Sequence, residues 1–221
     1  RSAEVAEAGV DELIKLARPG VDGAVLWADV IAKLSELRSE FFPLAITVDP
    51  IGTQKPKRYT NPPIGKRLAT NTLIASEVNS IRGAQLTQMC QPILLGKVPA
   101  EWQPVIELQK DIYEAGLAML KPGATFGALK DFVDAYGAKR GMKTIMQLHG
   151  CGYGDDGPLF NARFHGEQVR DLGIEAGNAF VWKPIALSAD GKIQFTWGGP
   201  VLVTENGAEA LFKRAHGMVE V

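Results

Sequence analysis

The chain has 221 residues, which is enough for one large domain or two small ones. Its net charge of −1 gives no strong field that would favour nucleic acid or an anionic membrane. No apolar run approaches the roughly 20 residues that a membrane span requires. The two cysteines, Cys90 and Cys151, do not form a disulfide framework, so a reducing compartment, the cytoplasm, is expected.

The first part of the chain shows two helical patterns followed by strands. The expected elements are helices over 3–17 and 24–37, a strand over 41–48, a basic loop over 49–68, and a hairpin of strands over 72–78 and 86–89. The breaker Arg18-Pro19-Gly20 ends the first helix.

The second part repeats this order. The expected elements are helices over 101–120 and 126–139, an extended segment over 143–148, a glycine-rich loop over 147–158, and strands over 179–187, 193–197 and 200–204. Lys121-Pro122-Gly123 ends a helix as Arg18-Pro19-Gly20 does, and Glu77 and Lys183 occupy matching points of their strands. This weak internal repeat predicts a single α/β domain with two pseudo-symmetric halves, about 1–97 and 98–221.

Neither half could bury its apolar faces alone, so the two sheets are expected to join. The prediction is one curved, mostly antiparallel sheet backed by four helices. Ligand sites favour crevices between such halves.

The glycine-rich stretch over 147–158 contains His149 and the adjacent carboxylates Asp155 and Asp156. Glycines allow a backbone to approach a ligand closely, and loops often carry functional groups. His149 titrates near neutral pH and is therefore a candidate general acid or base. Asp155 or Asp156 would orient it or bind a cationic substrate. Trp182 and Trp197 are expected to wall the pocket.

Motifs along nearly the whole chain resemble a known family. They are Glu7-Ala8-Gly9, Arg18-Pro19-Gly20, Lys121-Pro122-Gly123, Leu148-His149-Gly150-Cys151-Gly152 and the segment 201–209. Their order and spacing resemble the pita-bread family of methionine aminopeptidase, prolidase, aminopeptidase P and creatinase. The resemblance implies the pita-bread fold and possible homodimers. Longer members have a preceding N-terminal domain; it is expected to be absent from this chain, which starts without Met and reads as a fragment.

The resemblance also implies a site with two divalent metals, held by two aspartates, a histidine and two glutamates, that activates water for attack on an amide. The matching positions of this chain are Glu77, Gln85, His149, Lys183, and Gly198 or Gly199, and a further catalytic histidine position is Asp156. An ammonium group at Lys183 would repel a dication. The expectation is therefore no dinuclear metal site and no cofactor, with Lys183 paired to Glu77.

Two functions remain open. The first is a metal-independent hydrolase or lyase acting on a small amide- or guanidinium-like compound. In it His149 is the acid or base, and Lys183 is an electrophile or amine nucleophile. The alternative is a catalytically inactive pseudo-peptidase that keeps the cleft as a binding module. Both predict a small-molecule or short-peptide ligand, with Gln85 among the binding residues, and no nucleic-acid or membrane partner.

Overall fold

The computed structural model describes residues 1–40, 44–53, 62–160 and 167–221. The first half consists of α1 (Ser2–Leu16), α2 (Gly23–Glu36), β1 (Ala45–Pro50), β2 (Thr72–Arg82), β3 (Gln85–Met89) and β4 (Ile93–Leu94). The two expected helices and the expected hairpin are confirmed, and β2 continues four residues further than predicted, to Arg82. The basic cluster of the 49–68 loop falls largely outside the described residues.

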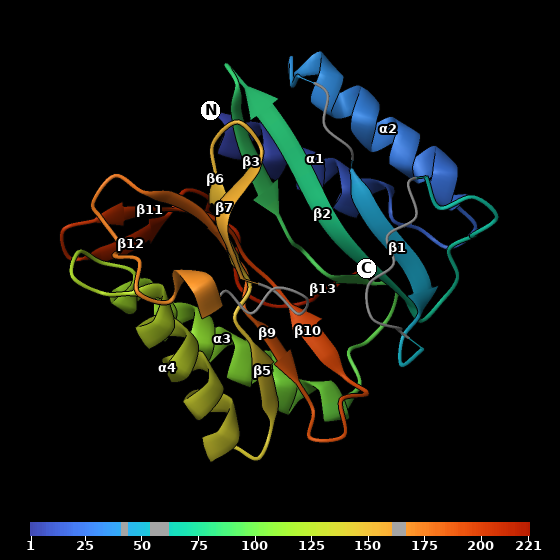
Figure 1. Cartoon of the computed structure of the whole chain (residues 1–221). Helices are drawn as coiled ribbons and strands as arrows, with labels where there is room; N and C mark the ends of the chain where they lie inside the picture. Colours follow the sequence, from blue (N-terminus) through green and yellow to red (C-terminus); the bar gives the residue numbers. More distant parts are fainter. Residues whose placement is uncertain (41–43, 54–61, 161–166) are drawn as a thin grey trace.

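The second half opens with the short 3-10 helix η1 (Ala100–Trp102), followed by α3 (Gln103–Met119) and α4 (Phe126–Lys139). Its remaining elements are β5 (Lys143–Ile145), β6 (Leu148–Cys151), β7 (Asp155–Phe160), η2 (Glu167–Val169), β8 (Ala179–Trp182), β9 (Ile185–Leu187), β10 (Gln194–Thr196), β11 (Gly199–Thr204), β12 (Gly207–Ala210) and β13 (Val219–Glu220). Figure 1 shows α1 and α2 beside the strands of the first half, and α3 and α4 beside those of the second.

The described strands form three hydrogen-bonded sheets, where the sequence predicts one. Their orders are β1-β2-β4-β13 with β3 paired to β2, β10-β9-β5, and β12-β11-β8-β6-β7. An isolated bridge between Cys90 and Gly198 connects the first half to the second, with the amide of Cys90 donating to the carbonyl of Gly198 at 2.8 Å.

Proline explains one break in the expected sheet. The predicted strand over 179–187 is divided into β8 and β9 at Lys183 and Pro184. Pro184 has no N–H for a ladder hydrogen bond. The amide of Lys183 instead donates to the carbonyl of Gln147 at 3.1 Å, outside both strands.

The glycine-rich stretch is mainly a β-hairpin and not the loop that its composition predicts. Strands β6 and β7 pair antiparallel, with a register shift between His149 and Gly150. Only residues 152–154 form the turn. His149 is therefore held inside a sheet, between β7 and β8.

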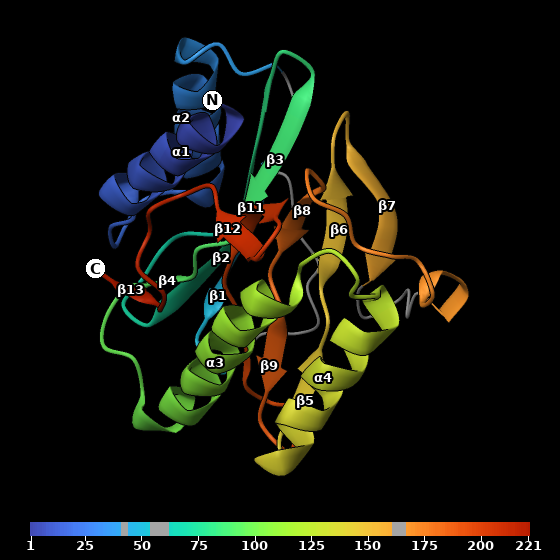
Figure 2. The same ribbon diagram turned by 90° about the vertical axis from the view of Figure 1, so that its left-hand side faces the viewer.

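A glycine brings one helix of each half close to its sheet, and Figure 2 shows both helices on the same side of the strands. A Cβ atom at Gly9 of α1 would lie 2.9 Å from Val78 of β2. A Cβ atom at Gly116 of α3 would lie 2.5 Å from the ring of Trp182 of β8. The apolar core fills the space between these helices and the sheets.

Candidate functional site

Strand alternation directs a set of polar side chains to the sheet face opposite the helices. Val78 packs on α1, so its neighbour Glu77 points the other way. On β3, Gln88 lies directly opposite Asn79 and shares the face of Glu77. His149 lies opposite Val181 on β8, two residues before Lys183. The two halves thus contribute Glu77, Gln88, His149 and Lys183 to one place.

An ion pair joins the halves at this place. Lys183 Nζ lies 2.9 Å from Glu77 Oε1, and the two side chains are only 2% and 13% exposed. The pairing predicted from the sequence is therefore present. Since both charges have left bulk water, each depends on its partner and on nearby hydrogen bonds for stabilisation.

His149 is also held on both sides. The residue is 3% exposed, with Nδ1 2.8 Å from the Gly150 carbonyl oxygen and Nε2 3.3 Å from Gln88 Oε1. The carbonyl oxygen of Gly150 and Oε1 of Gln88 both only accept hydrogen bonds, so the tautomer of His149 decides which ring nitrogen donates.

The residue of β3 that lies beside His149 is Gln88. The family resemblance instead predicts Gln85 at this place. Gln85 is exposed at the start of β3, and its amide donates to the carbonyl oxygen of Cys151. Gln88 is buried and lies three residues after Gln85 on the same strand. The two-residue period of a strand could have identified Gln88 from the sequence. Gln85 and Gln88 are three residues apart, so their side chains point to opposite faces of the strand.

Both tryptophans are buried in the core, and neither lines the cavity described below, whereas the sequence predicts them in a pocket wall. Trp182 is fully buried, and its Nε1 donates to the carbonyl oxygen of Tyr113 at 3.1 Å. Trp197 is 4% exposed and packs edge-on against Tyr113, with ring centroids 4.8 Å apart. Their large apolar area is more stably placed between α3 and the sheet than on an open wall.

The acidic pair of the hairpin lies one strand away from the buried histidine. The backbone of Asp156 is opposite Gly150, and that of Asp155 is opposite Cys151. Their side chains lie outside the described part of the chain. The roles predicted for them stay predictions.

At Gly198, the last position that the family resemblance matches to a metal ligand, two backbone segments lie very close together. Gly198 has φ +144°, and a Cβ atom there would lie 2.2 Å from the carbonyl oxygen of Trp182. Any side chain at Gly198 would require the backbone to move. At Gly199 a Cβ atom would lie 3.0 Å from the ring of Phe212.

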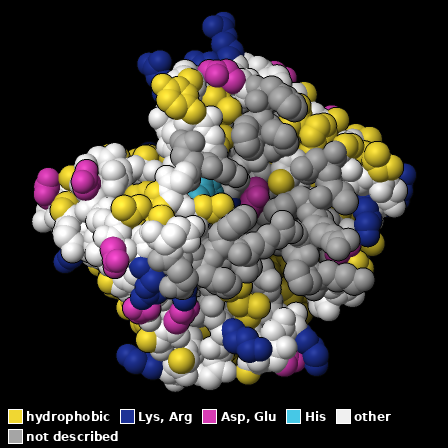
Figure 3. Space-filling model, in the orientation of Figure 1, with side chains coloured by type: hydrophobic (Ala, Val, Ile, Leu, Met, Phe, Trp, Pro, Cys, Tyr) yellow, Lys and Arg dark blue, Asp and Glu magenta, His cyan; other side chains and the backbone are white. Residues whose placement is uncertain are grey.

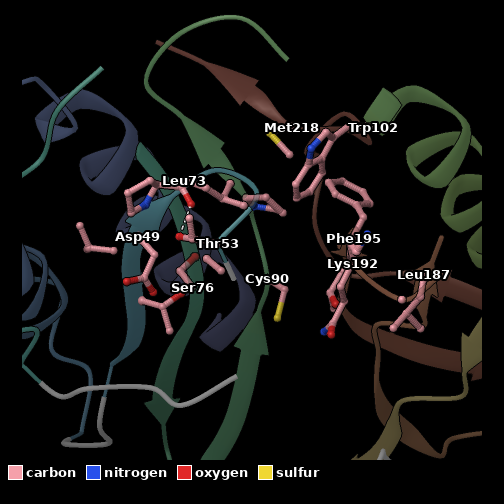
Figure 4. Close-up of a pocket in the computed structure, with 18 of the residues that line it drawn as sticks. Asp49, Thr53, Leu73, Ser76, Cys90, Trp102, Leu187, Lys192, Phe195 and Met218 are labelled. Atoms are coloured by element: carbon pink, nitrogen blue, oxygen red, sulfur yellow. Dashed lines mark hydrogen bonds between the residues drawn. The ribbon is translucent and has the colours of Figure 1, made fainter. Parts of the chain in front are cut away.

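A cavity of about 610 Å³ opens between the halves, as Figure 4 shows. Asp49, Leu73 and Ser76 line it from β1 and β2, while Phe195 and Leu187 line it from β10 and β9. Cys90, which forms the isolated bridge with Gly198, lies between these walls.

The surface, the metal-binding residue types and the helices give three further facts. Figure 3 shows Lys, Arg, Asp and Glu side chains of both signs scattered around the edge of one face. Within the described ranges, no three His, Cys, Asp or Glu side chains come together as metal ligands would. The described helices also include none that is both long and apolar enough to cross a membrane.

Comparison with known proteins identifies relatives of peptidases. Over 144 residues the chain is 26% identical to methionine aminopeptidase 1 of Dictyostelium discoideum, a match covering 56% of this chain and 38% of that protein. The chain thus spans well under half of that curated relative.

Solved structures share the fold over almost all of the chain. An X-Pro aminopeptidase of Thermotoga maritima superposes with a TM-score of 0.83 at 16% identity, covering 100% of this chain and 61% of that one. A methionine aminopeptidase of the same organism gives 0.72 at 15% identity, covering 96% and 94%. These matches show the mixed α/β pita-bread fold. The model of metallopeptidase family M24 matches residues 1–205, so this chain belongs to that family.

Proposed function

We propose that this chain is a metal-independent binding domain of family M24, whose cleft holds a small molecule or a short peptide. The observation that carries the proposal is the buried ion pair between Lys183 and Glu77. It places an ammonium group on the sheet face opposite the helices, at the position where the family resemblance implies a metal-binding glutamate.

The side chains at this place do not fit a pair of divalent metals. Among the described side chains at the matched metal-ligand positions, Glu77 is the one carboxylate and His149 the one imidazole, and the nearby Gln88 contributes a neutral amide. Gly198 has no room for a ligand side chain. Hard and borderline dications require several anionic oxygens, and a cation about 4 Å away is repelled by several kcal/mol even at an effective dielectric of 20.

The contacts made by Lys183 and His149 favour a binding role over a catalytic role. Lys183 Nζ is held by the Glu77 carboxylate at 2.9 Å, whereas a nucleophile needs an amine that can reach the substrate. His149 is buried and contacts Gly150 and Gln88. The similar proteins are named as aminopeptidases, dipeptidases and prolidases, which supports a peptide-like or amide-bearing ligand.

A second candidate is a metal-independent hydrolase or lyase acting on an amide- or guanidinium-like compound. The specific observation in its favour is that His149 lies opposite Val181 of β8, two residues before Lys183, so both side chains are on one face of the sheet. An acid or base and a cationic group are then available beside one ligand. We further propose a cytoplasmic protein, because two cysteines in 221 residues do not make a disulfide framework, and a homodimer.

Metal analysis tests the main proposal. The purified chain is incubated with manganese, cobalt or zinc, passed over a desalting column, and analysed by mass spectrometry for bound metal. We expect far less than one ion per chain. One or two ions per chain, lost in the His149→Ala variant, would overturn the proposal. Amide turnover that persists in a strong chelator would instead support the second candidate.

A gain-of-binding variant sharpens this test. Changing Gln88→Asp together with Lys183→Glu adds two carboxylates beside Glu77 and His149, and we expect it to retain metal. Lys192→Glu repeats the charge change of Lys183→Glu at an exposed position and is expected to retain none. Should the double variant fail to fold, Gln88→Asp alone and the unmodified chain still test the proposal.

A further inference from the structure

The cavity between the halves has the size of a small-molecule site. Its volume of about 610 Å³ lies within the range of about 300–1,000 Å³ that ligand pockets occupy. Thr47, Leu73 and Ala75 line it from the first half. The opposite wall comes from β9 and β10, so a ligand there would contact both halves.

One side of the cavity is apolar and aromatic. Trp102, Phe195 and Met218 lie close together in Figure 4, on the side of the second half. Trp102 and Phe195 are 2% and 1% exposed, so their rings are fixed by the surrounding core. Two ordered rings and an adaptable thioether favour a flat apolar group in a ligand.

A buried hydroxyl in the lining has no hydrogen-bond partner. Thr196 is 6% exposed and lines the cavity, and its Oγ1 bonds to no group of the described chain. A hydroxyl both donates and accepts, and a buried one that does neither is rare in folded proteins. Oγ1 itself has less than 1 Å² of accessible surface, so a ligand amide or hydroxyl would satisfy it, without carrying charge, once the Thr196 side chain rotates toward the cavity.

The charged groups at the cavity already have partners. Asp49 pairs with Lys66 at 3.0 Å, and Lys192 pairs with Asp190 at 3.2 Å. The side chain of Lys192 is 83% exposed, so its ammonium is hydrated and lies at the rim. A charged ligand group placed near Thr196 would be desolvated without a dedicated counter-charge.

We propose that this cavity binds a small uncharged molecule with a flat apolar group and one amide or similar neutral hydrogen-bonding group. The apolar group contacts Trp102, Phe195 and Met218, and the neutral group bonds to Thr196. This inference rests on the proposed binding role and names its ligand class. It excludes the guanidinium-like cation that the sequence left open.

Four probes of one ring size test the ligand class. Benzamide carries the neutral amide, benzoate a negative charge, benzamidine a positive charge, and ethylbenzene no polar group. Binding to the whole chain is measured by isothermal titration and by ligand-detected NMR. We expect benzamide to bind at one site and more tightly than the other three.

Substitutions place the probe in the cavity. Thr196→Val keeps the shape and removes the hydroxyl, so benzamide should bind about five- to tenfold more weakly while ethylbenzene is unaffected. Thr87→Val is the matched control, because Thr87 also has a buried hydroxyl without a partner but does not line the cavity. Ala75→Phe should prevent binding of every probe, and Leu187→Trp does the same from the opposite wall if Ala75→Phe does not fold.

Three results would overturn the inference. The first is that benzamide does not bind at a concentration of about 10 mM, which is about a hundredfold above a Kd of about 0.1 mM. The second is that benzamide binds equally to the unmodified chain and to the folded cavity-filling variant. The third is that benzamidine or benzoate binds more tightly than benzamide. None of these affects metal content, so a failed ligand class is distinguishable from a failed metal-independent role.

Discussion

The two halves of the chain use the same packing to present opposite charges. In the first half, Gly9 brings α1 close to Val78 of β2. The preceding residue, Glu77, points to the opposite face of that strand. In the second half, α3 approaches β8 at Gly116 and Trp182, and Lys183 follows directly. The repeat therefore keeps the contact between helix and strand while the charge at the cleft differs, and the two charges meet at 2.9 Å.

The halves differ in how each charged residue is held. β2 continues through Glu77 from Thr72 to Arg82, so the carboxylate is fixed within a long strand. Lys183 follows the end of β8, since Pro184 cannot continue the ladder. The ammonium is thus placed by a local break in the sheet and by the bond from its amide to Gln147.

Breaking the pair from one side should give the largest effect. Lys183→Met keeps the length of the side chain but leaves the carboxylate of Glu77 without its ammonium partner. We expect a loss of about 3–5 kcal/mol in the free energy of unfolding, measured by urea denaturation. The double variant Glu77→Gln with Lys183→Met should recover most of it. A single-variant loss below about 1 kcal/mol would mean that the pair does not hold the halves together.

The two helix glycines should differ in their tolerance of a methyl group. Gly116→Ala meets the fixed ring of Trp182 at 2.5 Å, and we expect a loss of about 2 kcal/mol. Gly9→Ala meets the end of the flexible Leu34 side chain at 2.7 Å, and the helix propensity of alanine offsets part of the strain. Its loss should be about 1 kcal/mol or less. Equal losses in urea denaturation would contradict this difference.

A further expected effect depends on pH and belongs to the second half. Burial lowers the pKa of His216 to about 4, with a smaller contribution from Lys110 and an opposing one from Asp111. His216 Nε2 contacts Gln109 of α3. The unfolded chain binds the proton more tightly, so this contribution is complete at neutral pH and is lost as the pH falls from about 6.5 to about 4.

Measured stability should follow that sign. Discounted for partial exposure to solvent, the loss is about 1–2 kcal/mol in urea denaturation series between pH 7 and pH 4. His216→Gln removes the titrating group, so its stability should change less over this range. An unchanged pH dependence in the variant would assign the effect to other groups.

Local signals in the sequence predicted the helices well. The predicted bounds of α4 match because both ends are set by neighbours: Thr125 Oγ1 accepts a hydrogen bond from the amide of Ala128 at 3.2 Å, and Gly141 takes a positive φ of 64°. Strands were less predictable. β4 and β13 pair in parallel through Ile93 and Val219, a contact that depends on the whole chain between them.

By itself, the sequence determined the order of the elements, the family resemblance and the opposite signs of Glu77 and Lys183, because these depend on residue types and on spacing along the chain. Only the tertiary structure decided that Gln88 is the neighbour of His149, that Trp182 and Trp197 belong to the core, and that a cavity with Thr196 in its lining lies between the halves. The reason is that facing, burial and empty volume are set by segments that meet only after folding, here β3 with β6, α3 with β8, and β1–β2 with β9–β10.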